Sequence, residues 1–137
     1  MTAKEYLTQA RMLDFEITCK QEEINQLYLK ATCVQAVVIS ERVQSSHENS
    51  SNQIIDKILD LQREINSEIC KLIELKTEIR KKISAVDVTL FRVLLTDYYI
   101  NGYTFEQIAE KLNYSWRQIM RMHGLALQDF RRCHNMS

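Results

Sequence analysis

The sequence predicts an all-α protein, in which a long antiparallel helical hairpin is followed by a C-terminal helix-turn-helix. The 137-residue chain has no proline and only two glycines, so few residues break a helix. Apolar residues recur at multiples of three and four over long stretches, which is typical of amphipathic helices and coiled coils. We therefore expect two domains, an antiparallel coiled-coil hairpin over residues 1–84 and a helix-turn-helix module over residues 85–137.

The first helix is expected to begin at a capping box, in which the side chains of Thr2 and Glu5 bind each other's backbone amides. Nothing breaks a helix from there to about residue 39. One apolar stripe follows this helix and indicates its buried side: Leu7, Ala10, Ile17, Ile24, Tyr28, Ala31 and Val38.

Residues 40–52 are polar and rich in serine and asparagine, which favours a loop. A second helix is expected to start near Ser51 or Asn52 and to end in the cations of residues 80–82, which suit a helix C-terminus. Its apolar stripe matches that of the first helix: Ile55, Ile58, Ile65, Ile69, Leu72, Ile79 and Ile83. Two such helices should fold back on each other. Because a helix pair buries little by itself, we expect a homodimer through the hairpin, or docking on another molecule.

A third helix is expected over residues 88–100, ending at Asn101 and Gly102. Residues 104–107 and 115–118 then form two further capping boxes, each opening a short helix. Between them stand a small residue, Ala109, and a turn residue, Asn113, and a branched apolar residue, Ile119, follows ten positions after the alanine. This spacing is typical of a helix-turn-helix, because the two helices cross closely. The alternative is a plain helical hairpin.

The start of the last helix contains the candidate DNA-binding residues, since this part of a helix-turn-helix enters the major groove. Arginine can form two bonds to guanine and glutamine can do the same with adenine; phosphate contact or simple solvation are the alternatives. Trp116 could instead pack on Tyr114 or Tyr103, and the backbone at Thr104 could bind a phosphate. His123 is expected to be packed or solvated. The candidate set is Thr104, Ser115, Trp116, Arg117, Gln118 and Arg121.

Composition argues against several other classes of protein. The charges balance at 18 basic and 18 acidic residues, but from residue 104 onward five basic residues face three acidic ones. The four cysteines, at positions 19, 33, 70 and 133, have no zinc-site spacing, and we expect them to stay reduced. No glycine-rich phosphate loop, nucleophile constellation or long apolar segment is present. We therefore expect a cytoplasmic protein that is not an enzyme, with no catalytic residues, cofactor, metal or membrane contact.

Residues 99–112 and 114–127 resemble region 4 of bacterial sigma-70 factors. The first seven residues and the run at 55–61 are similar to phage and prophage proteins of Firmicutes that are related to ArpU-type late-gene regulators. The resemblance implies a phage-encoded transcription regulator in the host cytoplasm, with the β flap of host RNA polymerase as a partner. Arg117 stands where sigma factors often have an acidic residue, so their promoter preference does not transfer. The chain also has no counterpart of the promoter-melting sigma region 2.

The leading hypothesis is therefore a sequence-specific regulator that binds double-stranded DNA and activates phage late genes with host RNA polymerase. Two alternatives remain open. One is a DNA-packaging protein similar to a small terminase subunit, which also combines a helix-turn-helix with a helical hairpin. The other is a sigma mimic that binds polymerase without binding DNA.

Overall fold

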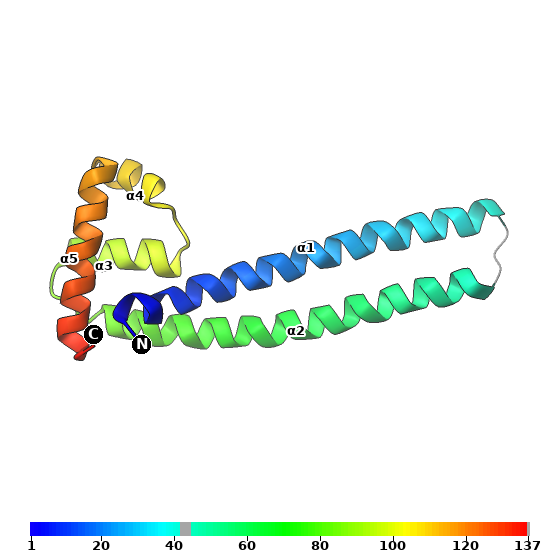
Figure 1. Ribbon diagram of the computed structural model, residues 1–137, viewed down its shortest axis with the longest axis horizontal. Coiled ribbons are helices and arrows are strands. Elements are labelled where there is room, and N and C mark those ends of the chain that lie inside the picture. The colour runs from blue at the N-terminus through cyan, green and yellow to red at the C-terminus, as the bar shows by residue number, and fades with distance from the viewer. Residues whose placement is uncertain (42–44, 137) are drawn as a thin grey trace. The chain divides into compact units, whose positions relative to one another are not determined.

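The protein is all-helical over the part of the chain that its computed structural model describes, namely the backbone of residues 1–41 and 45–136. Side chains are described for residues 1–32 and 52–136. Within these ranges there is no β-strand, which confirms the predicted all-α class. The elements follow in the order α1 (Ala3–Glu41), α2 (Ser45–Ile83), α3 (Thr89–Leu95), the π-helical turn η1 (Thr96–Ile100), α4 (Phe105–Leu112) and α5 (Trp116–His134) (Figure 1).

The predicted loop over residues 40–52 is mostly helical. Helix α1 extends to Glu41 and α2 already begins at Ser45, well before the expected start near Ser51 or Asn52. Serine and asparagine are only weakly unfavourable inside a helix, and extending an existing helix costs far less than starting one. Residues 42–44, and the side chains of Val38 and Cys33, lie outside the described part of the chain.

Contacts divide the chain into two compact units that differ from the predicted domains. Unit 1 joins Met1–Asp14 to Leu72–Ser137, and unit 2 is Phe15–Lys71. The first turns of α1 therefore belong with the C-terminal region, because Tyr6 stacks on Phe130 of α5 at a ring distance of 6.3 Å. The hydroxyl of Tyr6 also donates to Glu78 near the end of α2, at 3.0 Å.

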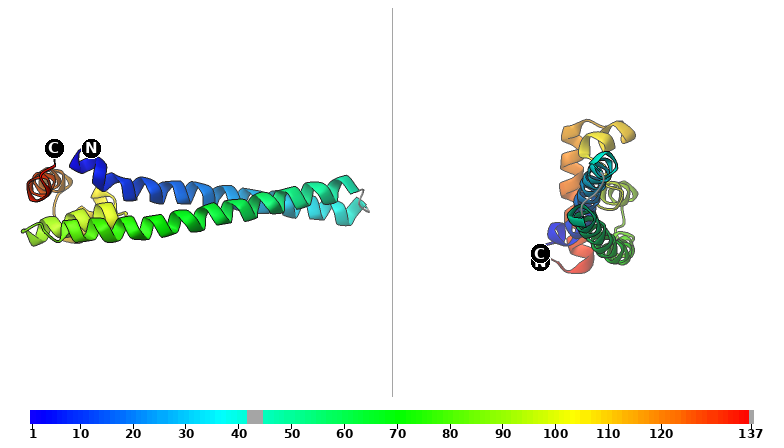
Figure 2. Two further views of the ribbon diagram at one scale, coloured as in Figure 1. Left: turned by 90° about the horizontal axis from the view of Figure 1, so that it is seen from below. Right: turned by 90° about the vertical axis from the view of Figure 1, so that its right-hand side faces the viewer.

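Unit 2 is a pair of antiparallel helices. Lys20 of α1 contacts Glu64 and Glu68 of α2, whereas Tyr28, farther along α1, contacts Gln62, earlier on α2. Figures 1 and 2 show the two helices side by side. The apolar residues between them are Ile24, Ile58 and Ile65, with Ile17, Leu27, Ile54 and Leu61 packed around them.

Three residues of the predicted stripes are not buried between the helices. Tyr28 is 50% exposed, Ile55 41% and Ile69 39%. A helix pair has a single narrow seam, and successive residues are turned by about 100° around a helix, so an apolar residue next to the seam position faces the flank. Ile54 and Ile58 occupy the seam beside Ile55.

Unit 1 packs the start of α1 and the end of α2 with α3, η1, α4 and α5. Thr2 and Glu5 form the predicted capping box at 3.0 and 3.2 Å. Gly102 takes the left-handed conformation, with φ of +76°, as predicted for the break after the third helix. The largest fully buried side chains of the described part are Leu7, Ile79, Ile83, Val86, Leu94, Leu95, Tyr99, Ile108, Ile119 and Phe130, together with Ile24 in unit 2.

The third helix is not a single α-helix to residue 100 as predicted. It changes to a π-helical turn at Thr96, where the N–H of Asn101 donates to the Thr96 carbonyl at 2.9 Å. None of the described helices combines the length and the apolar character needed to cross a membrane.

Candidate nucleic-acid interface

A three-residue turn joins α4 to α5. Asn113 takes the left-handed conformation, with φ of 60° and ψ of 39°, as its position in the sequence predicts. The N–H of the next residue, Tyr114, donates to the carbonyl of Ala109 at 3.0 Å. The turn therefore has one tight geometry, and this geometry determines the direction in which α5 leaves it.

Capping boxes open both helices, as predicted. At α4 the N–H of Thr104 donates to Gln107 at 2.9 Å, and the N–H of Gln107 donates to the Thr104 hydroxyl at 3.2 Å. Ser115 and Gln118 repeat this arrangement at the start of α5, with the same two distances. Each box satisfies two amides that a helix start otherwise leaves unpaired, so the first turn of α5 is well defined.

The inner side of α5 holds it against the rest of unit 1. Ile119 and Phe130 are fully buried, while the predicted inward residue Met122 is only half-buried. His123, beside Met122, is 6% exposed, so the packed interpretation of this histidine is confirmed. Its ring lies 4.9 Å from that of Phe105.

His123 shares a hydrogen bond of 2.7 Å between its Nε2 atom and the Tyr99 hydroxyl. Burial, together with the smaller effect of the nearby Lys4 charge, lowers the pKa of His123 to about 4. Burial likewise raises the pKa of Tyr99. Both groups are therefore uncharged at neutral pH, and each satisfies the other's buried polar atom.

An ion pair between a buried carboxylate and an exposed lysine links η1 to α4. Asp97 is 3% exposed and accepts a hydrogen bond from the Lys111 ammonium at 3.0 Å and another from the Asn101 side chain at 3.1 Å. The N–H of Tyr103 also donates to the Asp97 carbonyl at 2.9 Å. An acidic residue two positions after the buried Leu94 and Leu95 is the sequence signal that could have pointed to this ion pair.

Arg11 of α1 supports the loop before α4. Its guanidinium donates to the carbonyls of Tyr98 at 2.9 Å and Tyr103 at 3.3 Å, and lies 4.1 Å from the centre of the Tyr98 ring. No local sequence pattern predicts this contact, because Arg11 and the two tyrosines are far apart in the chain.

The structure exposes all six candidate residues, and it brings five of them together at the start of α5. Thr104 lies apart from these, at the start of α4. Arg117 and Arg121 stand one helical turn apart, and within the described part of the chain neither guanidinium group has a hydrogen bond or ion pair. The proposed packing of Trp116 on Tyr114 or Tyr103 is wrong: Trp116 is 53% exposed and makes no ring contact with the described residues.

The capping boxes engage the other three candidates. The Gln118 side-chain oxygen already accepts the Ser115 N–H, and the Ser115 hydroxyl accepts the Gln118 N–H. Two-point recognition of adenine by glutamine uses both the side-chain oxygen and the amide nitrogen. Gln118 therefore cannot form both bonds to adenine while its oxygen closes the capping box. The Thr104 N–H likewise donates to Gln107. Contrary to the expectation, this N–H is therefore not free to donate to a phosphate.

We expect Gln118→Ala to lower the free energy of unfolding by about 1 kcal/mol, because one half of the cap is lost. Gln118→Glu should unfold at nearly the native urea concentration, because glutamate closes the same box. Gln107→Ala, at the start of α4, is the matched variant and should resemble Gln118→Ala. Urea unfolding followed by circular dichroism tests this, and equal stability of Gln118→Ala and the native chain would contradict the structural role.

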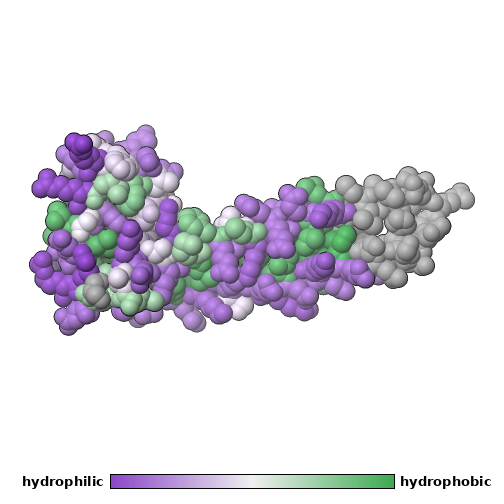
Figure 3. Space-filling view, in the orientation of Figure 1, coloured by the Kyte–Doolittle hydropathy of each residue, from purple (hydrophilic) through white to green (hydrophobic). Residues whose placement is uncertain are grey.

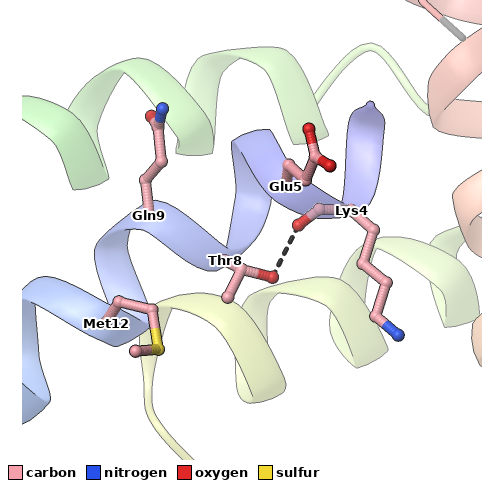
Figure 4. Close-up of a pocket in the computed structure, with 5 residues that line it drawn as sticks. All are labelled: Lys4, Glu5, Thr8, Gln9 and Met12. Atoms are coloured by element: carbon pink, nitrogen blue, oxygen red, sulfur yellow. Dashed lines mark hydrogen bonds between the residues drawn. The ribbon is translucent and has the colours of Figure 1, made fainter. Parts of the chain in front are cut away.

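A shallow hollow on α1 offers no competing site. It is lined by Lys4, Glu5, Thr8, Gln9 and Met12, which all come from one helix, and the Thr8 hydroxyl donates to the Lys4 carbonyl (Figure 4). In the described part of the chain, no three His, Cys, Asp or Glu side chains are grouped so that they could hold a metal ion. Cys19, Cys70 and Cys133 are free thiols, as expected, but are exposed.

Residues 33–130 match a family model described as a protein of unknown function, DUF1492. The match covers well over half of the chain. The chain belongs to the DUF1492 family. The DUF1492 match contains the whole of α2, α3 and α4 and all six candidate residues, so the exposed start of α5 lies within the family region. No curated protein and no solved structure matches the chain significantly.

Proposed function

We propose that α4 and α5 form a helix-turn-helix that binds double-stranded DNA, and that the protein acts by binding and not as an enzyme. The observation that supports this best is the pair Arg117 and Arg121, exposed and without partners among the described residues, on a helix start fixed by a capping box. Arginines that are not paired with carboxylates are available to guanine or to phosphate.

The spacing of the two arginines suits the major groove. Four residues along a helix correspond to about 6 Å, which is close to the rise of two base pairs. Each guanidinium can donate two hydrogen bonds to the O6 and N7 atoms of a guanine. Trp116 adds an exposed apolar surface beside Arg117, suited to a thymine methyl group. The nitrogen of Gln118 remains available as a single donor.

On the resemblance to sigma-70 region 4 and to ArpU-type proteins, we propose transcription regulation as the biological role. This includes activation of phage late genes together with host RNA polymerase, in the cytoplasm of a bacterial host. The polymerase contact rests on the resemblance alone, whereas DNA binding also rests on the exposed arginines.

The test is binding of the native protein to fragments of its source genome at several salt concentrations. A sequence-specific regulator should select one promoter-proximal fragment over random duplex of equal length, roughly a thousandfold or more. Equal binding to every fragment with a steep salt dependence would favour packaging or architecture, because phosphate contacts alone produce that behaviour. No binding at low salt would rule out the DNA proposal and favour the polymerase-binding alternative.

A further inference from the structure

One flank of the helix pair in unit 2 is strongly charged. Lys20 lies 3.5 Å from Glu64 and 4.0 Å from Glu16, and also contacts Glu68. A shallow pocket farther along the same pair is lined mostly by charged residues: Glu23, Lys30, Lys57, Asp60 and Glu64, with Leu27 and Leu61. Lys20 and Glu68 are partly buried, whereas the charged residues that line this pocket are all exposed.

On the opposite flank, the described side chains of residues 15–32 and 52–71 include no charged residue. On α2 a stripe with spacings of four and three residues runs along this side, and on α1 a second stripe has the same spacing. The Gln62 side chain donates to the Tyr28 hydroxyl at 3.4 Å, so the two stripes lie side by side. We call these nine exposed residues the uncharged face: Gln21, Asn25, Tyr28 and Thr32 of α1 with Ile55, Leu59, Gln62, Asn66 and Ile69 of α2.

The uncharged face resembles an interface core in its lack of charge, and four of its nine residues, Tyr28, Ile55, Leu59 and Ile69, are large and apolar or aromatic. Leu59 is 44% exposed, and Ile55, Ile69 and Tyr28 are similarly exposed, whereas the seam beneath is small. Interface cores are depleted of charged residues and enriched in apolar and aromatic ones. Figure 3 shows hydrophobic residues among hydrophilic ones along the helix pair, on the side in view. From Ile55 to Ile69 the α2 stripe extends for about 21 Å.

We propose that the uncharged face binds the same face of a second copy of this chain. In a two-fold contact the same surface meets itself, so residues near the axis meet their own copies. A charged side chain there would meet a like charge, whereas aliphatic residues pack on aliphatic residues. The amides of Asn25, Gln62 and Asn66 suit such a contact because each is both donor and acceptor. This inference does not depend on DNA binding.

The mass of the full-length protein in solution tests the proposal. Sedimentation equilibrium should give twice the chain mass of 16.2 kDa. Leu59→Lys combined with Ile69→Lys places two like charges on the face and should give a monomer with native helical content. The matched control is Gln53→Lys with Ser67→Lys, which adds the same charge to exposed positions of α2 outside both stripes. This control should remain a dimer.

The proposal would be overturned by a native monomer at all concentrations, by an assembly larger than a dimer, or by a dimer that persists in Leu59→Lys/Ile69→Lys. Loss of the dimer in the Gln53→Lys/Ser67→Lys control would overturn it as well, because the effect would then not be specific to this face. Arg117→Ala with Arg121→Ala should remain dimeric. A failure of DNA binding is thereby distinguishable from a failure of dimer formation.

Discussion

Replacing Arg117 and Arg121 together by alanine is expected to remove the preference of the protein for its selected DNA fragment. Each two-point arginine–guanine contact contributes about 1–3 kcal/mol of discrimination, or roughly a tenfold to hundredfold preference for the correct base. Both guanidinium groups are exposed on α5 and have no other partner in the described part of the chain, so no internal contact is lost with them. Fluorescence anisotropy with the selected and a scrambled duplex measures the ratio of affinities.

Arg131→Ala with Arg132→Ala is the matched control for this prediction. It removes the same charge from the other end of α5, where Arg132 pairs with Asp129 at 3.7 Å. If these residues contact DNA at all, they contact phosphates, and their loss should weaken binding to both duplexes equally. An unchanged affinity ratio in Arg117→Ala/Arg121→Ala would show that neither arginine recognises a base. An equal loss of the ratio in the control would show that charge alone determines the preference.

The features that the sequence predicted correctly at the candidate site are local ones. The boxes at Thr104 and Ser115 involve residues three positions apart, and the left-handed turn at Asn113 depends on one side chain. Such chemistry is visible in the sequence because both partners lie in the same short window. The exposure of Arg117 and Arg121 follows in turn from the helical period, once the buried position of Ile119 is set.

The features that the sequence did not predict depend on distant contacts. Asp97 pairs with Lys111, and Tyr99 with His123, across separate helices. Arg11 reaches Tyr98 from the other end of the chain. No periodicity connects such pairs, because only the packing of unit 1 brings them together. The prediction that α2 starts near Ser51 or Asn52 was wrong for a different reason. Residues of low helix propensity become helical when they extend a helix that already exists, and α2 therefore begins at Ser45.

The buried His123 should make the protein less stable in mild acid. Its pKa is lowered from 6.5 to about 4 in the folded state, mainly by burial, so the unfolded chain binds the proton more readily between these two values. Stability is therefore complete above pH 6.5 and decreases as the pH falls toward 4. The linkage relation gives a loss of about 2 kcal/mol between pH 7 and pH 5. Urea unfolding at the two pH values measures it.

His123→Gln separates this titration from the other effects of acid. Glutamine does not titrate and still offers an oxygen to the Tyr99 hydroxyl, which lies 2.7 Å from Nε2 in the native protein. The variant should be less stable at pH 7, because the ring also packs on Phe105, but its stability should change little between pH 7 and pH 5. A native protein that is equally stable at both values would contradict the lowered pKa. If native and variant lost equal stability, another group would be responsible, and an NMR titration of the His123 ring would then show a pKa near 6.5.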